Sequence, residues 1–320
     1  MERITARVPA TVANLGPGFD CLGLAVGLYT DITLEVDGGR AGMEITGEGY
    51  DALPTGRSNL VRRAIGRYFD AVGRPVPPLW LHMHNRIPTS GGLGGSAAAI
   101  VGGLVLANRL CGDLLSRSDL LELATEIEGH PDNVGPALEG GLIVATVEDG
   151  RVVAVKVPVP PSLRTVVYVP DFAMPTAESR RILPRTVHRQ QAIFNIGRAA
   201  MLVAAMCSGR LDLLGVATQD QLHQPYRQQI FPAMPRFFDA AVEAGALGAY
   251  LCGAGSALMA FTSGAEQEVL AAFRRVGEEV GVPGRVGVLE ICEHGAEVWG
   301  ESAPQPMPSQ LDALLEEVAV

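Results

Sequence analysis

The chain has 320 residues, 48% of them hydrophobic, which is long for one core and sufficient to bury the cores of two domains. Its 35 acidic residues outnumber its 25 lysines and arginines, and the net charge of -10 argues against nucleic acid or a membrane surface as partner, because both attract clustered basic residues. The chain also shows no run near the roughly 20 apolar residues of a membrane span and no apolar signal-peptide block at its start, so we expect a cytoplasmic protein.

The first half of the chain is predicted to combine short strands with helices. Alternation of polar and apolar residues predicts a strand near residues 4–8, and a turn-rich segment follows at 13–20. The further elements expected are strands near 22–36 and 42–46, a helix over 59–72, a strand over 79–85, helices over 96–110 and 117–128, and a strand over 142–147.

A stretch rich in Val and Pro, residues 152–161, indicates a domain boundary, which we place between residues 157 and 158. The elements expected beyond it are a strand over 165–169, helices over 177–183 and 186–208, two shorter helices, strands over 247–252 and 257–262, a helix over 265–280 and a strand over 285–292. This order predicts an α+β fold, with helices on one face of an antiparallel sheet. Residues 304–320 are interpreted as a tail.

The cysteines and histidines do not predict a zinc site. The five cysteines are scattered without a Cys-x-x-Cys pair, which is typical of reduced thiols, and we interpret them as small core residues. His82 and His84 share one face of a strand, but no third ligand lies within reach in the sequence, so we interpret them as an ordinary strand pair.

The strongest local signal is a glycine-rich loop joined to an apolar helix. Four of the five residues from 91 to 95 are glycine, and glycine allows backbone N–H groups to approach an anion closely. Ser96 then opens a helix whose first N–H groups have no intrahelical partner and whose dipole favours negative charge. The loop therefore predicts a phosphate-binding site.

Three other interpretations of the loop fit the sequence less well. A Walker-type loop would require a lysine that is missing here. The spacing of Gly92, Gly94 and Ala97, with Asp113 downstream, fits a dinucleotide fingerprint, but the preceding strand alternates polar and apolar residues, whereas a central parallel strand is apolar on both faces. A turn that serves only helix packing would account for glycines inside the helix, but not for the loop.

Four motifs, in order, resemble those of the GHMP kinases, a family that includes galactokinase and mevalonate kinase. Residues 88–98 resemble the family's nucleotide loop, and residues 13–20 resemble the amino-terminal motif of members that phosphorylate homoserine. Residues 128–134 and the turn Gly253–Ser256 agree, so the resemblance runs from residue 4 to about 262. It implies an N-terminal domain like domain 2 of ribosomal protein S5, a C-terminal ferredoxin-like α/β sandwich, and a homodimer.

The resemblance further implies a kinase that uses ATP and Mg²⁺. The implied ATP-binding residues are Pro88, Thr89, Ser90, Gly91, Gly92, Leu93, Gly94, Gly95, Ser96, Ala97, Ala98 and, at the adenine, Asn59. The family usually has serine where this chain has Gly95, and Cys252 and Ser256 also depart from the common pattern. We expect these departures to change affinity while activity is retained.

Ser96 and Glu128 are the magnesium ligands that the resemblance implies. Leu121, Ala124 and Glu128 fall on one helical face, so this carboxylate would be costly to bury without a compensating cation. The alternative is a glutamate at a helix end that reaches solvent. Glu126 is the neighbouring candidate if Glu128 is not the ligand.

The implied acceptor is L-homoserine, converted to O-phospho-L-homoserine for threonine synthesis. A free amino acid requires a carboxylate for its ammonium and arginine for its carboxylate. The resemblance assigns the acceptor site to Asn14, Asp20, His130, Thr176, Arg180 and Arg227. Taken singly, Asn14 could instead cap its own turn, and Arg180 could be a solvated helix residue.

The implied catalytic residues are His130, Asp132 and Asn133. Asp132 aligns near the carboxylate that acts as base in relatives of mevalonate kinase, yet homoserine-phosphorylating members manage without a dedicated base, because a loose transition state demands little of the nucleophile. Two alternatives stay open: a GHMP kinase acting on mevalonate or a sugar, and a metabolite-binding protein without catalysis.

Overall fold

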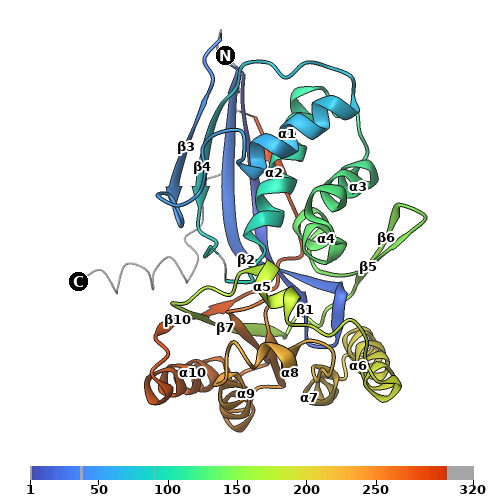
Figure 1. The fold of residues 1–320 in the computed structure, drawn as a ribbon, viewed down its shortest axis with the longest axis vertical. Coiled ribbons are helices and arrows are strands. Elements are labelled where there is room, and N and C mark those ends of the chain that lie inside the picture. The colour runs from blue at the N-terminus through green and yellow to red at the C-terminus, as the bar shows by residue number, and fades with distance from the viewer. Residues whose placement is uncertain (1, 37–38, 90, 301–320) are drawn as a thin grey trace.

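The computed structural model describes residues 2–36, 39–89 and 91–300, which form two sheets, each with helices on one face (Figure 1). The chain passes from the first sheet to the second between residues 157 and 164. The arrangement confirms the predicted α+β class. Ser90 and the expected tail 304–320 lie outside the described residues.

The first sheet is built around a long antiparallel pair of strands, β1 and β2. Its strand order is β11-β1-β2-β4-β3, and β5 pairs with β2 and β6. The strands are β1 Glu2–Asn14, β2 Gly18–Val36, β3 Gly42–Gly47, β4 Trp80–Asn85, β5 Leu142–Glu148, β6 Arg151–Val157 and β11 Glu297–Trp299. In the part of the chain that the structure describes, the helices lie on one face of this sheet, so β1 buries Ile4, Ala6 and Val8 while Arg3 on the alternate side is exposed.

Four helices cover that face: α1 Leu60–Ala71, α2 Gly95–Leu110, α3 Arg117–Glu128 and α4 Pro131–Glu139. The Asn59 side chain caps α1 by accepting a hydrogen bond from the Val61 amide, and Ser116 begins α3 with a capping box. α2 packs closely because a Cβ at Gly102 would lie 2.5 Å from Ile32 and one at Gly103 would lie 2.6 Å from the Val61 carbonyl. The sequence does not predict α4, because Pro136 disfavours a helix interior.

β4 explains the alternation seen before the glycine loop. It runs parallel to β3 but antiparallel to β2, and its Leu81 and Met83 face the helices and are buried. The other face carries the two histidines, of which His82 lies 3.3 Å from Glu44, and His84 Nδ1 lies 2.8 Å from the Thr46 hydroxyl. A parallel neighbour is thus compatible with an alternating strand when one face of the sheet lacks helices.

The second sheet has four antiparallel strands in the order β10-β7-β9-β8. The strands are β7 Arg164–Pro170, β8 Gly248–Leu251, β9 Leu258–Thr262 and β10 Gly284–Leu289, and α9 Met234–Glu243 and α10 Glu266–Val280 pack against them. The other helices are α5 Thr176–Arg181, α6 Arg189–Ser208, α7 Leu214–Ala217 and α8 Gln224–Arg227, with a 3₁₀ turn at Leu211–Leu213.

Two strands were not predicted. β6 overlaps the stretch rich in Val and Pro that was interpreted as a domain boundary, but its β-branched residues pair with β5 through a turn at Asp149 and Gly150, both with positive φ. β11 is too short for a periodic signal, and it returns to the first sheet beside β1. The predicted end of the preceding strand, residue 292, was wrong because the Cys292 amide instead donates to the Ala25 carbonyl of β2.

The cysteines differ in burial. All five are free thiols, and Cys252 is fully buried, as expected for a core residue. Cys21, Cys111 and Cys292 are half-buried, and Cys207, near the end of α6, is exposed. The interpretation as core residues was therefore wrong for Cys207.

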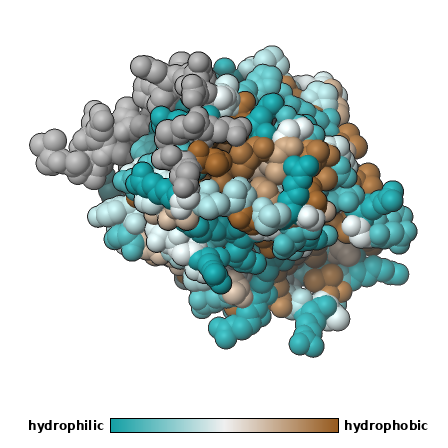
Figure 2. All heavy atoms as spheres, turned by 90° about the horizontal axis from the view of Figure 1, so that it is seen from above, coloured by the Kyte–Doolittle hydropathy of each residue, from teal (hydrophilic) through white to brown (hydrophobic). Residues whose placement is uncertain are grey.

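The surface is mixed. From above, hydrophilic side chains line the rim and apolar ones gather near the middle (Figure 2). One helix among the described residues, α6, is long and apolar enough to cross a membrane by length and composition alone. Only 22% of the apolar stretch of this helix is buried inside the protein.

Candidate active site

One cavity, with a volume of about 330 Å³, collects nearly all the predicted site residues from segments of both sheets. Those that line it are Asn14, Asp20, Asn59, Pro88, Thr89, Gly91, Gly92, Leu93, Gly94, Gly95, Ser96, Glu128, His130, Asp132, Asn133, Thr176, Arg180 and Arg227. Ala97 and Ala98 are fully buried within α2, behind the lining.

The glycine loop is fixed by its backbone. The Thr11 amide donates to the Leu93 carbonyl at 3.1 Å, and the Ala257 amide donates to the Gly91 carbonyl at 2.9 Å. Gly94 has a φ of 69°, and a Cβ there would lie 1.9 Å from the Thr11 hydroxyl oxygen. Gly94 precedes α2 without a side-chain cap, so the first amides of the helix remain available to an anion.

A second glycine turn lies against the loop. A Cβ at Gly92 would lie 2.2 Å from the Cys252 carbonyl, so the two turns approach each other as closely as glycine permits. The Gly253 amide donates to the Ala13 carbonyl at 3.1 Å, and the Gly253 carbonyl accepts from Asn14 Nδ2 at 2.9 Å. Gly253 and Ala254 also line the cavity, although they were not among the predicted site residues.

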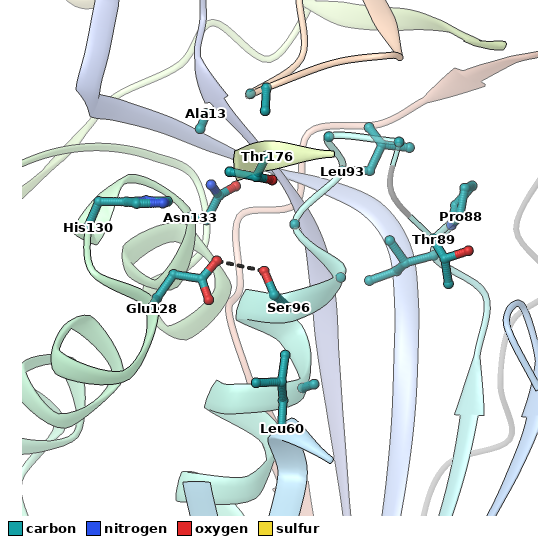
Figure 3. A pocket seen from close by; sticks show the side chains of 18 of the residues that line it. Ala13, Leu60, Pro88, Thr89, Leu93, Ser96, Glu128, His130, Asn133 and Thr176 are labelled. Atoms are coloured by element: carbon teal, nitrogen blue, oxygen red, sulfur yellow. Dashed lines mark hydrogen bonds between the residues drawn. The ribbon is translucent and has the colours of Figure 1, made fainter. Parts of the chain in front are cut away.

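Ser96, in the first turn of α2, and Glu128, the last residue of α3, point their side chains toward each other (Figure 3). The Ser96 hydroxyl donates to Glu128 Oε1 at 2.6 Å. Hydroxyl and carboxylate oxygens are ligands that Mg²⁺ accepts, so this pair of cavity-lining oxygens fits the predicted metal. Glu126 is exposed and pairs with Arg67 at 2.7 Å, so it is occupied elsewhere.

Two predicted acceptor residues flank the turn between β1 and β2, Asn14 at the end of β1 and Asp20 near the start of β2. Asn14, Leu15 and Asp20 have φ values of 73°, 47° and 59°, a region that L side chains rarely adopt and that concentrates at functional sites. Asn14 Oδ1 accepts from the Asp20 amide at 3.1 Å. Asn14 therefore caps its own turn, which was the alternative to a role in the acceptor site, and it also lines the cavity.

Asp20 and Arg180 form a two-pronged ion pair. The two guanidinium nitrogens lie 3.0 and 2.6 Å from the two carboxylate oxygens, and the hydrogen bond to Asp20 is the main reason that the pKa of Arg180 is raised. The residue expected to bind an ammonium and the residue expected to bind a carboxylate thus satisfy each other. Sequence reasoning did not foresee this pairing.

Arg227 lies deeper, with 1% of its surface exposed. Its Nη1 donates to the Gly253 carbonyl at 2.8 Å. Burial lowers the pKa of Arg227 to about 10, so the guanidinium stays charged at neutral pH. The Phe19 ring lies 5.6 Å from this guanidinium and 5.5 Å from that of Arg180, which helps to compensate two neighbouring positive charges.

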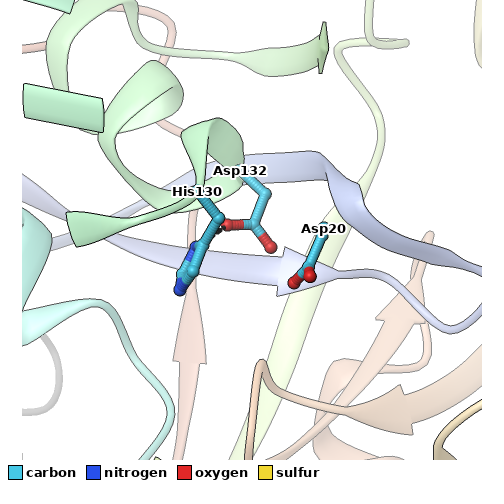
Figure 4. A group of neighbouring side chains, drawn as sticks. All are labelled: Asp20, His130 and Asp132. Atoms are coloured by element: carbon cyan, nitrogen blue, oxygen red, sulfur yellow. Dashed lines mark hydrogen bonds and ion pairs between the residues drawn. The ribbon is translucent and has the colours of Figure 1, made fainter. Parts of the chain in front are cut away.

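Asp20, His130 and Asp132 point their polar atoms toward one another, all within 4.8 Å (Figure 4). Burial lowers the pKa of His130, but its hydrogen bond with Asp132 and the charge of that carboxylate outweigh burial, so the pKa is raised overall. Asp132 is 2% exposed. Beside them, Asn133 Oδ1 accepts from the Thr11 hydroxyl at 2.9 Å.

A further part of the cavity lining is largely apolar, and it was not predicted from the sequence. This part comprises Leu53, Pro54, Ser58, Leu60, Met83, Asn85 and Ile87. In the sequence, such residues cannot be distinguished from core residues. Asn59 was expected at the adenine, but both groups of its side-chain amide have partners within the protein. Its Oδ1 accepts from the Val61 amide and so caps α1, and its Nδ2 donates to the Pro54 carbonyl at 2.8 Å. Asp113, required by the dinucleotide alternative, pairs instead with Arg109.

Comparison with known proteins shows similarity over nearly the whole chain. The family models described as "GHMP kinases N terminal domain" and "GHMP kinases C terminal" match residues 59–141 and 202–279. A homoserine kinase of Moorella thermoacetica is 46% identical over 91% of this chain and 98% of its own. A homoserine kinase of Synechococcus sp. is 41% identical over 94% and 99%.

Solved structures agree with the sequence comparisons. The crystal structure of homoserine kinase from Cytophaga hutchinsonii has a TM-score of 0.85 and 31% identity, covering 93% of this chain and 98% of that one. L. major mevalonate kinase in complex with R-mevalonate has a TM-score of 0.70 at 18% identity over 89% and 94% of the two chains. At that identity, the mevalonate kinase shows a shared fold alone.

Proposed function

The chain belongs to the GHMP kinase family, and from that membership we propose that it transfers the γ-phosphoryl group of ATP to the side-chain hydroxyl of L-homoserine, yielding O-phospho-L-homoserine. One observation carries the proposal. A single cavity has a glycine-loop anion site at one end and a carboxylate with two arginines at the other. This combination suits a zwitterionic acceptor, whereas mevalonate and sugars have no ammonium for Asp20.

At the nucleotide end, we assign the triphosphate to the backbone amides of residues 91–96. Glu128 and Ser96 would hold Mg²⁺, which when bound neutralises phosphate charge. The apolar lining around Leu60 and Met83 would receive the adenine. These assignments rest on the close oxygen pair of Ser96 and Glu128 and on the positive φ of Gly94.

At the acceptor end, we assign the substrate ammonium to Asp20 and Asn14 and the substrate carboxylate to Arg180 and Arg227. The zwitterion would exchange with the ion pair of Asp20 and Arg180, so each side chain gains an opposite charge as it gives one up. The exchange leaves the net charge of the site unchanged. Both Asp20 and Arg180 keep about a third of their side chains exposed, so substrate can reach them.

His130 and Asn133 border the place where the acceptor hydroxyl would lie. Asp132 is held by His130 and is not required as a base, because a loose transition state calls for little proton removal before the bond forms. Asp132→Asn is therefore expected to keep measurable turnover. Complete loss of turnover with ATP binding intact, measured by calorimetry, would contradict this view.

We also propose a cytoplasmic homodimer. The free thiols of all five cysteines suit a reducing compartment. Ile193 and Ile196 of α6 are 60% and 68% exposed, and Val155 of neighbouring β6 is 61% exposed, so this surface would be covered by a second copy. Light scattering should give twice 33.7 kDa, and a variant with Ile193→Glu and Ile196→Glu should give a monomer.

The deciding experiment is ADP release, measured with a coupled assay, on a panel of L-homoserine, mevalonate and galactose. We expect release with L-homoserine. Release with mevalonate or galactose instead would support another GHMP kinase, and ATP binding without release on any acceptor would support a non-catalytic protein. If the acceptor is mevalonate or galactose, which lack an ammonium, Asp20→Ala should leave acceptor affinity nearly unchanged.

A further inference from the structure

A buried polar cluster lies directly behind the acceptor end of the cavity. It consists of Asn195 on α6, Asp220 and His223 before α8, and Arg227 at the end of α8. The side chains of Asp220 and His223 are 0% exposed, and Asn195 is 3% exposed. Burial of so many polar groups is costly unless they form hydrogen bonds with one another. The hydrogen bonds of the cluster therefore show which residues it holds in place.

The hydrogen bonds determine the tautomer of His223. Arg227 Nη1 lies 2.9 Å from His223 Nδ1, and because a guanidinium can only donate, Nδ1 must accept. His223 Nε2 lies 2.7 Å from the Gly16 carbonyl, which can only accept, so Nε2 carries the hydrogen. The imidazole is neutral, in agreement with burial that lowers the pKa of His223 to about 4.

Asp220 fixes the turn that carries both residues. Its Oδ2 accepts from the amides of His223 and Gln224 at 2.9 and 2.7 Å, and its Oδ1 accepts from Asn195 Nδ2 at 2.7 Å. Asn195 Nδ2 also lies 3.2 Å from the Pro17 carbonyl. The negative charge of Asp220 raises the pKa of Arg227 against the effect of burial, so one buried charge compensates the other.

Arg227 is thereby held on two sides and open on a third. Nη1 donates to His223 and to the Gly253 carbonyl, and Nε lies 3.4 Å from the Ser179 carbonyl. Nη2 has no acceptor among the residues that the structure describes, and Arg227 lines the cavity. A guanidinium with one free donor edge is prepared for an anionic group of a ligand.

We propose that His223 is a positioning residue for the amino-acid acceptor. Through Nδ1 it orients Arg227, on the carboxylate side, and through Nε2 it holds the Gly16 carbonyl in the turn that carries Asn14 and Asp20, on the ammonium side. His223 thus sets the separation of the two sides, which must match the fixed separation of the two charges of an α-amino acid. This inference rests on the proposed function.

Three substitutions of His223 test its hydrogen bonds to Arg227 and to the Gly16 carbonyl separately. His223→Asn keeps an oxygen near the Nδ1 position but cannot reach Gly16, His223→Gln keeps a donor near the Nε2 position but not the acceptor for Arg227, and His223→Phe removes both. His294, which is exposed, supplies the control His294→Gln. Thermal unfolding of each variant establishes that it is folded before kinetics are compared.

We expect His223→Phe to raise KM for L-homoserine about ten- to a hundredfold, the usual effect of weakening one charged hydrogen bond, with the KM for ATP within threefold of wild type. Asn and Gln should give intermediate values. The preference for L-homoserine over 3-aminopropan-1-ol, which lacks the carboxylate, should also shrink in His223→Phe, because Arg227 no longer discriminates.

A purely structural role would lower the melting temperature and kcat without a selective rise in KM for L-homoserine, and that result would overturn the inference. Equal rises in the KM values of both substrates would overturn it as well. If the wild-type protein releases no ADP with L-homoserine, the proposed function fails first. An active wild type with unchanged KM in His223→Phe contradicts the positioning role alone.

Discussion

The two ends of the cavity are built in opposite ways. The phosphate end is contiguous backbone, residues 91–96, held by main-chain hydrogen bonds to Thr11 and Ala257. The acceptor end is assembled from side chains of residues 14–20, 130–133, 176–180 and 223–227, which carry charges and pair across large sequence separations. A backbone site is sensitive to where a Cβ is added, whereas a side-chain site is sensitive to which charges remain.

The largest effect should come from Glu128, the charged side chain that the described residues place at the phosphate end. Glu128→Gln removes an anionic oxygen from the predicted metal site, so we expect kcat to fall about 100-fold or more, as measured by ADP release. Glu126→Gln is the matched control, because that residue pairs with Arg67 on the surface, and its activity should equal wild type. The reverse ranking of the two variants would exclude Glu128 as the ligand.

Next in size is the removal of one charge at the acceptor end. Asp20→Asn keeps the backbone bond to Asn14 but leaves the substrate ammonium without a carboxylate, so KM for L-homoserine should rise about 10- to 50-fold. KM for ATP should stay within twofold, as measured by varying each substrate in turn. A parallel rise in both KM values would show that the two ends of the cavity are not separable.

A smaller effect is expected when the phosphate backbone is disturbed. Gly94→Ala places a Cβ 1.9 Å from the Thr11 hydroxyl oxygen and forces alanine into a left-handed backbone that costs about 1–2 kcal/mol, so KM for ATP should rise about tenfold and the melting temperature should fall. Gly95→Ala is the control, because its Cβ would meet only Ile87, at 3.7 Å. Equal sensitivity of both positions would contradict the backbone account of this site.

The smallest expected effect is on the pH dependence of stability, which should differ between a substitution at the acceptor end and one at the phosphate end. Burial lowers the pKa of His223 to about 4, below the value of about 6.5 in the unfolded chain, so the unfolded state binds the extra proton between these values. Stability should therefore be complete above pH 6.5 and decline as pH falls toward 4. The melting-temperature advantage of wild type over His223→Gln should shrink between pH 7 and pH 5, whereas the difference between wild type and Gly95→Ala should not change.

Local sequence signals were sufficient for most elements. The helix predicted over residues 117–128 has those bounds in the structure, where Ser116 and Gly129 cap its ends, and capping depends on neighbours in the sequence. The glycine loop could be identified for the same reason, since its function lies in its own backbone. Resemblance to the family was needed to bring Ser96 and Glu128 together, because they are 32 residues apart.

The acceptor end shows where sequence reasoning stops. Asp20 and Arg180 were both expected there, but their ion pair spans 160 residues and no local pattern encodes it. His223 belongs to the same short motif as Arg227, yet its role depends on the Gly16 carbonyl, 207 residues away. Apolar lining residues such as Met83 give no signal at all, because an apolar strand residue looks the same beside a ligand as in a core.

The return of β11 to the first sheet has a consequence for how the protein is made. β1 has two strand neighbours, and one of them, residues 297–299, follows the whole second sheet in the chain. During synthesis, the first sheet therefore cannot be completed until the second half of the chain has left the ribosome. A fragment cut after residue 157 would leave one edge of β1 unpaired, and such an edge invites aggregation.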